Sequence, residues 1–313
     1  MTRAERIEGA LPGLLVGDAL GVPYEFHSPD EIPEFEQIEF EPPEGFQRAH
    51  DGTPAGTWSD DGAQALCLLA SLLDKGKLEP ADLAKRFVKW YDHGYMAVDN
   101  RVFDIGITTG AAIRRYQSGI PAPEAGIDEV SANGNGSLMR VLPLALCHKG
   151  SDEALVQDAQ LQSCVTHRHL RSQACCALYC LWARKLLNNE TDAWDKAVAK
   201  LKSIYQNDEL RLAELKFHIR PLEPYETQGS GYVVDALHSA KECIETTSSY
   251  EMAVKKAVAF GNDTDTTACI AGGIAGLIYG KEGIPGRWLK QLRGIEIYQT
   301  LQNELMIQNH EVS

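Results

Sequence analysis

Apolar residues recur every three or four positions in many stretches of the chain, which is the pattern of helices that bury one face. No stretch shows the strict alternation of apolar and polar residues that predicts a strand. We therefore predict an all-α protein with many helices around one core. In the first half of the chain, helices are expected over 3–21 and 59–74, from Pro80 through Tyr91, and around 111–113. In the second half, they are expected over 155–187 with a break near 166–169, over 192–205, 207–217, 233–245 and 249–260, through the apolar run 268–278, and from Trp288 onward.

The first predicted helix carries two unusual features. Pro12 lies inside it and is expected either to kink the helix or to move its start to a later residue. Gly13, Gly17 and Gly21 follow one another at four-residue spacing. Residues four apart share one helix face, so we expect this face to pack closely against another helix.

Three segments rich in proline and glycine lack helical periodicity and are predicted to be loops: 28–58, 118–132 and 218–232. The first is long for a connection within a compact domain. Such loops often serve as lids or binding segments.

Two predicted helices begin with clustered acids and hydroxyls. Ser59-Asp60-Asp61 precedes one, and Asp263-Thr264-Asp265-Thr266 precedes the other. Helix capping alone explains such residues at a helix start, but one start does not need two aspartates, and packed carboxylates repel one another unless a cation lies between them. Oxygen ligands suit magnesium, manganese or calcium. The second stretch is not an EF-hand loop, since the sixth position from Asp263 is Ala268 instead of glycine.

A glycine-rich segment, Asn133-Gly134-Asn135-Gly136-Ser137, precedes the apolar residues that begin at Leu138. If this turn opens a helix, its backbone amides suit a phosphate. It matches neither the P-loop nor the dinucleotide-binding pattern, and a plain turn is the alternative. Asp104, before the helix around 111–113, could simply cap that helix.

Composition limits the function further. The chain has 313 residues, 44% hydrophobic and 24% charged, which is typical of a soluble globular protein. A formal net charge of −14 disfavours nonspecific binding to nucleic acid or to an anionic membrane. We expect no signal peptide and no membrane span. The eight cysteines form no C-x-x-C pair and are expected to be mostly buried thiols in a reducing cytoplasm. A zinc site from Cys164, His167, His169 and Cys175 fits no standard spacing.

Five motifs in order resemble the ADP-ribosylglycohydrolase family, and the resemblance covers about residues 5–295. The motifs are Gly17-Asp18-Ala19-Leu20-Gly21 with Glu25, Trp58-Ser59-Asp60-Asp61, Asn133-Gly134-Asn135-Gly136-Ser137-Leu138-Met139-Arg140, Thr166-His167, and Gly261-Asn262-Asp263-Thr264-Asp265-Thr266. Phe103-Asp104-Ile105-Gly106 with Thr108-Thr109 looks most like the branch that contains the dinitrogenase-reductase-activating glycohydrolase, which removes ADP-ribose from arginine.

The resemblance implies one domain over 1–313: a compact orthogonal bundle of helices with a central cleft holding two divalent cations, magnesium or manganese. The implied metal ligands are Ser59, Asp60, Asp61, Asp263, Asp265 and Thr266. Position 59 is commonly threonine in the family, and serine retains the hydroxyl. The implied catalytic residues are Glu25, Asp60, Asp61 and Asp104, and the implied substrate contacts are Asn133, Gly134, Asn135, Gly136, Ser137, Met139, His167 and Tyr232.

The activity implied is hydrolysis of the bond between ADP-ribose and an arginine side chain of a protein. A carboxylate at position 104 suits a guanidinium, which it can bind with paired hydrogen bonds. Serine-linked or polymeric ADP-ribose and small ADP-ribosylated metabolites are alternative substrates. Two other functions are alternatives. One is a phosphatase of the haloacid-dehalogenase type, whose nucleophile motif resembles Asp263–Thr266 but should follow a strand. The other is a catalytically silent relative that only binds ADP-ribose or has a structural role.

Overall fold

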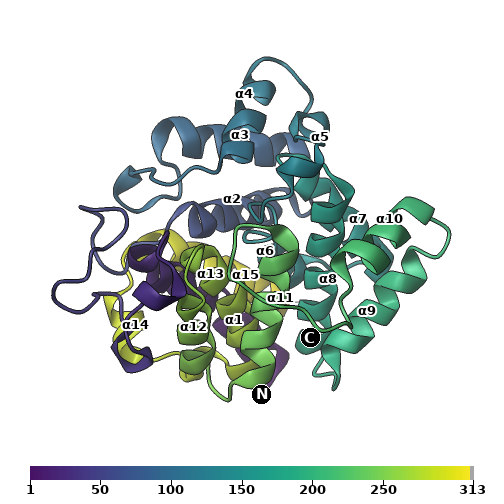
Figure 1. Cartoon of the computed structure of the whole chain (residues 1–313). Helices are drawn as coiled ribbons and strands as arrows, with labels where there is room; N and C mark the ends of the chain where they lie inside the picture. The colour runs from purple at the N-terminus through teal and green to yellow at the C-terminus, as the bar shows by residue number, and fades with distance from the viewer. Residues whose placement is uncertain (311–313) are drawn as a thin grey trace.

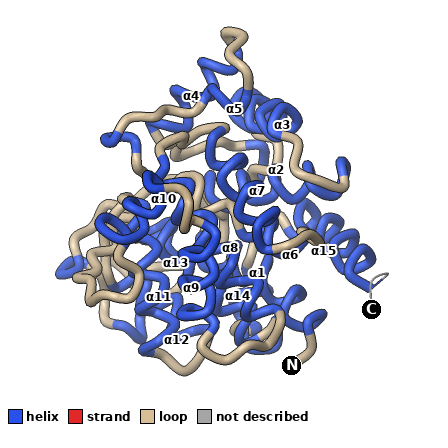
Figure 2. The backbone as a smooth tube through the Cα atoms, turned by 90° about the vertical axis from the view of Figure 1, so that its right-hand side faces the viewer, coloured by secondary structure: helices blue, strands red, loops and turns tan. Residues whose placement is uncertain are grey.

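The computed structural model describes residues 1–310, and in that part of the chain it contains fifteen α-helices and no β-strand (Figures 1 and 2). The all-α prediction is therefore confirmed. The helices are α1 (Arg3–Gly21), α2 (Asp60–Lys75), α3 (Pro80–His93), α4 (Ile107–Gln117), α5 (Ala122–Ala125), α6 (Leu142–Cys147), α7 (Asp152–Cys164), α8 (Leu170–Leu187), α9 (Ala193–Ile204), α10 (Glu209–Ala213), α11 (Val233–Thr246), α12 (Tyr250–Ala259), α13 (Thr264–Tyr279), α14 (Gly286–Gln291) and α15 (Ile295–His310).

Two helices from opposite ends of the sequence, α1 and α13, pack against each other with their backbones in contact. The glycines of α1 make this possible. A Cβ atom built on Gly17 would lie 2.1 Å from the carbonyl oxygen of Ala268, and one built on Gly21 would lie 2.3 Å from the Cα of Asp265. The close packing expected from the glycine repeat is confirmed, and its partner is the helix that begins with the second acidic motif.

Replacing Gly17 with alanine is expected to destabilise the protein by about 3 kcal/mol or more, because the added methyl group meets backbone atoms that cannot rotate away. Gly110 of α4 provides a matched helical control, since the nearest atoms to its built Cβ are side-chain atoms at 3.4 Å or more. Gly110→Ala should be neutral or stabilising by up to about 1 kcal/mol, through helix propensity. Urea unfolding measures the free energy of unfolding of both variants and of the wild type. Equal stability of the Gly17 variant and the wild type would contradict the packing argument.

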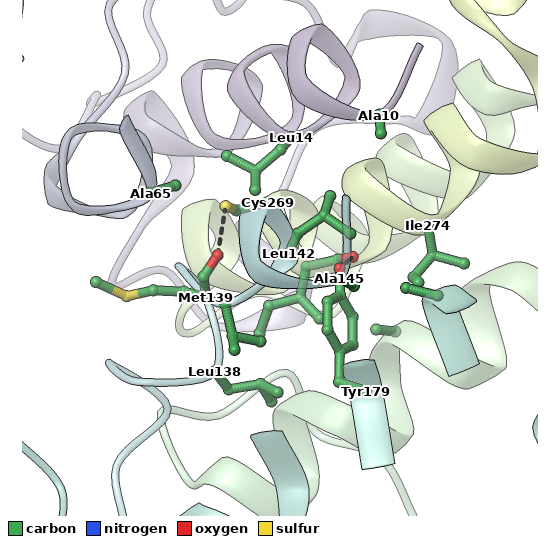
Figure 3. Close-up of a cluster of buried hydrophobic side chains, with 14 of the residues drawn as sticks. Ala10, Leu14, Ala65, Leu138, Met139, Leu142, Ala145, Tyr179, Cys269 and Ile274 are labelled. Carbon is green, nitrogen blue, oxygen red and sulfur yellow. Dashed lines mark hydrogen bonds between the residues drawn. The ribbon is translucent and has the colours of Figure 1, made fainter. Parts of the chain in front are cut away.

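The core lies where α1, α2, α6, α8 and α13 meet. Figure 3 shows Leu14, Leu142, Tyr179 and Ile274 converging there from four of these helices. All four side chains are almost completely buried. The hydroxyl of Tyr179 donates to the backbone carbonyl of Ile270 at 2.9 Å, so the one polar atom that this ring brings into the core is satisfied.

Two details differ from the sequence predictions. Pro12 does not shorten α1, which runs unbroken from Arg3 because residues 9–21 are all buried against neighbouring elements. The chain around and after Trp288 forms two helices instead of one, α14 and α15, separated by residues 292–294. Gly294 has a φ of +68°, and its Cβ would lie 2.4 Å from the ring of Trp58. The positive φ of Gly294 is incompatible with helix, and the ring of Trp58 leaves no room for a side chain at this turn.

The predicted loops contain short helical turns. The 28–58 segment holds 3₁₀ turns at Pro29–Glu31 and Phe35–Gln37, and α5 lies within the 118–132 segment. The helix expected over 207–217 is α10 followed by a π-helical turn at Glu214–Ile219. All eight cysteines are free thiols, six of them buried. Within residues 1–310, no helix combines the length and the hydropathy needed to cross a bilayer.

Candidate metal centre and active site

The two acidic motifs meet at one place, although 205 positions separate them along the chain. Thr266, in the first turn of α13, donates its hydroxyl to Oδ2 of Asp61 in the first turn of α2 at 3.3 Å. Ser59, the N-cap of α2, donates to the same oxygen at 2.9 Å. Two helix N-termini therefore point into one acidic cluster, and their positive dipole ends partly offset its negative charge.

The cluster contains carboxylate oxygens that the protein itself does not satisfy. Oδ1 of Asp61 and Oδ2 of Asp265 are buried and have no hydrogen-bond partner. One oxygen each from Asp18, Asp61 and Asp265 lies within 4.8 Å of the others, and the same holds for Glu25, Asp263 and Asp265. Buried, unpaired anionic oxygens are costly unless a cation binds them. The donor set thus fits hard divalent cations, and Asp265 belongs to both groups.

Burial and mutual repulsion raise the pKa of these carboxyl groups. Burial, followed by the charges of neighbouring acids, raises the pKa of Asp60, Asp61 and Asp265 well above the ordinary value. The same causes raise the pKa of Glu25 to about 10, with Asp104 the largest contributor after burial. Without a cation, these groups bind protons in place of a metal ion.

Divalent cations are expected to stabilise the protein more strongly as the pH rises. The pKa values of these carboxyl groups are higher in the folded than in the unfolded chain. Without a cation, their contribution to the free energy of unfolding is therefore complete below the pKa of the unfolded chain, about 4, and is lost as the pH rises toward the pKa values of the folded chain. A bound cation removes that loss. The increase in melting temperature on adding Mg²⁺ or Mn²⁺ to chelated protein should therefore grow between about pH 5 and about pH 8. NaCl at equal ionic strength is the control, and an increment that does not change with pH would contradict the cation-binding assignment.

Asp60 is oriented by a buried relay. Gln64, one turn further along α2, donates from Nε2 to Oδ2 of Asp60 at 2.9 Å. Arg140 donates to Oε1 of Gln64, also at 2.9 Å. Because a guanidinium can only donate, Oε1 must face Arg140 and Nε2 must face Asp60. One Asp60 oxygen is thereby held, and the other is left for the cavity.

A cavity of about 240 Å³ lies over the acidic cluster. Ten residues implied by the family resemblance line it: Glu25, Asp60, Asp104, Gly134, Asn135, Gly136, Met139, His167, Asp263 and Thr266. A second cavity of about 510 Å³ shares Glu25, Gly231 and Asp263 with the first. A cavity of about 480 Å³ elsewhere, beside Lys149 and Asp158, has no comparable cluster of carboxylates.

Asn135 connects the glycine-rich loop to the acidic cluster, because its side-chain amide donates to Oδ2 of Asp263 at 2.8 Å. Its backbone amide donates to the carbonyl of Gly231 at 3.0 Å. The loop does not open a helix directly, since α6 begins only at Leu142. Gly134 and Gly136 both lie against the imidazole of His167. The loop and His167 therefore form one wall of the cavity.

Asp104 lies on the cavity lining and not at a helix cap, because α4 begins at Ile107 with Gly106 as its N-cap. Its backbone has a φ of +48°. Burial, and then the charge of Asp263, raises its pKa to about 6. Its carboxyl group can therefore ionise near neutral pH and face a cationic group.

Other implied residues lie outside the lining of this cavity. Ser59, Asp61 and Asp265 lie in the acidic cluster below it. Asn133 bonds Val130 and Ser172 through its side chain. Ser137 accepts a hydrogen bond from Ser163 at 2.8 Å within the protein interior. The hydroxyl of Tyr232 accepts from Arg171 at 3.1 Å. For these residues, and for those on the lining, the assigned roles stay predictions.

The structure adds four residues to which the resemblance assigned no role: Asp18 and Arg140, which stand in its motifs, and His50 and Gln64, which do not. Both oxygens of Asp18 accept backbone amides of the α2 start, from Ser59 at 2.9 Å and from Gly62 at 2.7 Å. His50 contacts the carboxyl group of Glu25 through Nε2. A signal existed for Asp18, since an acid stands between the tightly packed Gly17 and Gly21. Nothing local marks His50 or Gln64.

The structure does not form the alternative sites. Cys164, His167, His169 and Cys175 belong to no cluster of potential metal ligands within residues 1–310. The nucleophile of a haloacid-dehalogenase phosphatase should follow a strand, whereas Asp263 follows α12 and is the N-cap of α13. That phosphatase alternative is contradicted by the all-α fold of the described residues.

Known proteins resemble the chain over almost all of its length. A family model described as ADP-ribosylglycohydrolase matches residues 1–312. The ADP-ribosylarginine hydrolase Tri1 of Pseudomonas putida (strain GB-1) is 32% identical over 303 residues, covering 96% of this chain and 78% of that protein. The ADP-ribosyl-[dinitrogen reductase] glycohydrolase of Rhodospirillum rubrum is 31% identical over 298 residues, covering 92% and 90%. A solved structure titled "ADP-ribosylglycohydrolase-related protein complex" has a TM-score of 0.77 at 29% identity and covers 98% of each chain.

Proposed function

Because the chain belongs to the ADP-ribosylglycohydrolase family, we propose that it releases ADP-ribose from ADP-ribosylated arginine on protein substrates, using two divalent cations. One observation carries this proposal: two groups of carboxylates that have Asp265 in common lie below a cavity whose lining includes Asp104 and the glycine-rich loop. The arginine linkage is supported by similarity to two relatives, one named an ADP-ribosylarginine hydrolase and the other an ADP-ribosyl-[dinitrogen reductase] glycohydrolase.

Mg²⁺ or Mn²⁺ would be held by Ser59, Asp60, Asp61, Asp263, Asp265 and Thr266, with Glu25 beside them. When bound, such ions orient ribose hydroxyls, lower the pKa of a coordinated water and offset the negative charge of the cluster. They would also allow an acidic protein to hold an anionic ligand.

The residues of the chain supply the other functions. Asp60, Asp61 or Glu25 accepts the proton of the attacking water, as positive charge builds at the anomeric carbon. Asp104 binds the departing guanidine through paired hydrogen bonds. The backbone amides and side chains of the 133–137 loop hold the diphosphate or the distal ribose, with His167 beside them.

The linkage is tested by incubating the protein, with Mg²⁺ or Mn²⁺, with substrates that carry ADP-ribose on arginine, on serine, as a polymer and on a small metabolite. Release of free ADP-ribose is expected from the arginine-linked substrate and should cease in excess chelator. Release only from another linkage would overturn the arginine assignment. Binding of ADP-ribose without turnover of any substrate would favour the catalytically silent alternative.

A further inference from the structure

Arg140 is a buried guanidinium at the centre of a network that reaches the cavity wall. It is fully buried and donates to four residues: Gln64, Gly136, Gln162 and Thr166. The bond to Thr166 is 2.8 Å from a guanidinium nitrogen to Oγ1. The same hydroxyl lies 2.8 Å from Nδ1 of His167. Arg140 therefore acts on the imidazole through one intervening hydroxyl.

The direction of the last hydrogen bond follows from counting donors. The Thr166 oxygen must accept from Arg140, because a guanidinium has no acceptor. The threonine side chain is completely buried, and Nδ1 of His167 is an acceptor that its hydroxyl proton can reach. If Nδ1 carried a proton instead, two donors would point at one hydroxyl whose own proton had no partner. A buried donor without a partner is unfavourable.

The other ring nitrogen, Nε2, lies beside the glycine-rich loop, which forms the cavity wall. A Cβ built on Gly134 would lie 3.6 Å from Nε2 of His167, and one built on Gly136 would lie 2.9 Å from Cε1, so the ring lies flush against the loop backbone. His167 is on the cavity lining. Burial, and then the charge of Arg140, lowers the pKa of His167 to about 3, which keeps the ring neutral. A neutral ring has one donor nitrogen and one acceptor nitrogen, and their assignment decides what it can bind.

We propose that Arg140, acting through the Thr166 hydroxyl, fixes His167 as the Nε2–H tautomer, so that the ring presents a hydrogen-bond donor to a phosphate or hydroxyl oxygen of the substrate. Arg140 and Thr166 are then positioning residues, and His167 is the group that contacts the ligand. The choice of ADP-ribose as the ligand rests on the proposed function, whereas the tautomer does not. A neutral donor also makes His167 a binding group and not a general acid.

The tautomer can be measured on the full chain without any ligand. Long-range ¹⁵N–¹H correlation spectra of ¹⁵N-histidine-labelled protein distinguish a protonated Nε2 from a protonated Nδ1, and His167→Gln identifies the signals among the nine histidines. We expect the wild type to show protonated Nε2 and unprotonated Nδ1. Protonated Nδ1 in the wild type overturns the proposal, even if no variant folds.

Two variants at position 166 separate positioning from packing. Thr166→Val keeps the shape and removes the hydroxyl, whereas Thr166→Ser keeps the hydroxyl. The valine variant should lose the single-tautomer pattern and bind ADP-ribose, in the presence of Mg²⁺, about tenfold more weakly, as expected for one hydrogen bond. The serine variant should retain both properties. Unchanged spectra and unchanged affinity for ADP-ribose in the valine variant would contradict the proposal. Failure of the wild type to bind ADP-ribose would instead contradict the proposed function, and the tautomer measurement would still stand.

Discussion

Replacing Asp265 with asparagine is expected to lower hydrolysis of ADP-ribosyl-arginine by on the order of 10³-fold or more, because this carboxylate belongs to two of the three candidate cation groups. The same change should raise the melting temperature of the chelated protein at neutral pH. Asp265 is completely buried, has one oxygen without a partner, and is repelled by Glu25, Asp61 and Asp263. An amide of the same size removes that repulsion, so activity and cation-free stability should change in opposite directions.

Asp235 provides the matched control for this substitution. It is also buried, but both of its oxygens accept hydrogen bonds, from Gln228 and from Ser230. Asp235→Asn should lower the free energy of unfolding by about 1–3 kcal/mol and leave the response to Mg²⁺ or Mn²⁺ intact. Thermal unfolding of both variants, with and without cation, distinguishes a cation-binding role of Asp265 from a structural one. If Asp265→Asn also destabilises the chelated protein and keeps the cation response, Asp265 is a structural residue.

The helices were largely predictable because their signals are local. Apolar spacing and polar caps such as Ser59 place the start of α2 within one residue of the observed helix. The glycine repeat of α1 likewise predicted a close helix contact. The break at Gly294 was missed, although a glycine is a local signal for such a break. Its packing against the ring of Trp58 could not be predicted, because that ring approaches only in the folded chain. Local patterns find elements, but they do not show which distant side chains pack against their ends.

The candidate site was predictable to the same extent. The paired acids of Asp60–Asp61 and Asp263–Asp265 stand out in the sequence because a helix cap does not need them. The residues that orient this site do not stand out. Gln64 reads as an ordinary helical residue, and its role depends on Arg140, which approaches from 76 positions away. Arg140 also bonds the carbonyl of Gly136 at 3.0 Å, so a single guanidinium connects Asp60, the loop and His167.

Replacing Asp104 with asparagine is expected to lower kcat/KM for the arginine-linked substrate by about 10²-fold while the affinity for free ADP-ribose changes by less than about twofold. The basis is chemical: an ionised carboxylate can bind a guanidinium through two charge-assisted hydrogen bonds, and an amide cannot accept both. Loss of a charged hydrogen bond of this kind costs about 1.5–3 kcal/mol, or about 10- to 100-fold. Free ADP-ribose has no guanidinium, so its binding should not depend on this charge.

Asparagine is the right substitution at position 104 for a backbone reason. Asp104 has a φ of +48°, a conformation that asparagine adopts readily and alanine does not, so the variant tests the charge without straining the turn. Asp99, which also has a positive φ but is exposed and paired with Arg293, is the matched control, and Asp99→Asn should leave both measurements unchanged. Steady-state kinetics measure kcat/KM, and calorimetry measures the affinity for free ADP-ribose. An equal loss of ADP-ribose affinity in the Asp104 variant would place this carboxylate at the cation centre and not at the leaving group, and the arginine preference would then need another residue to explain it.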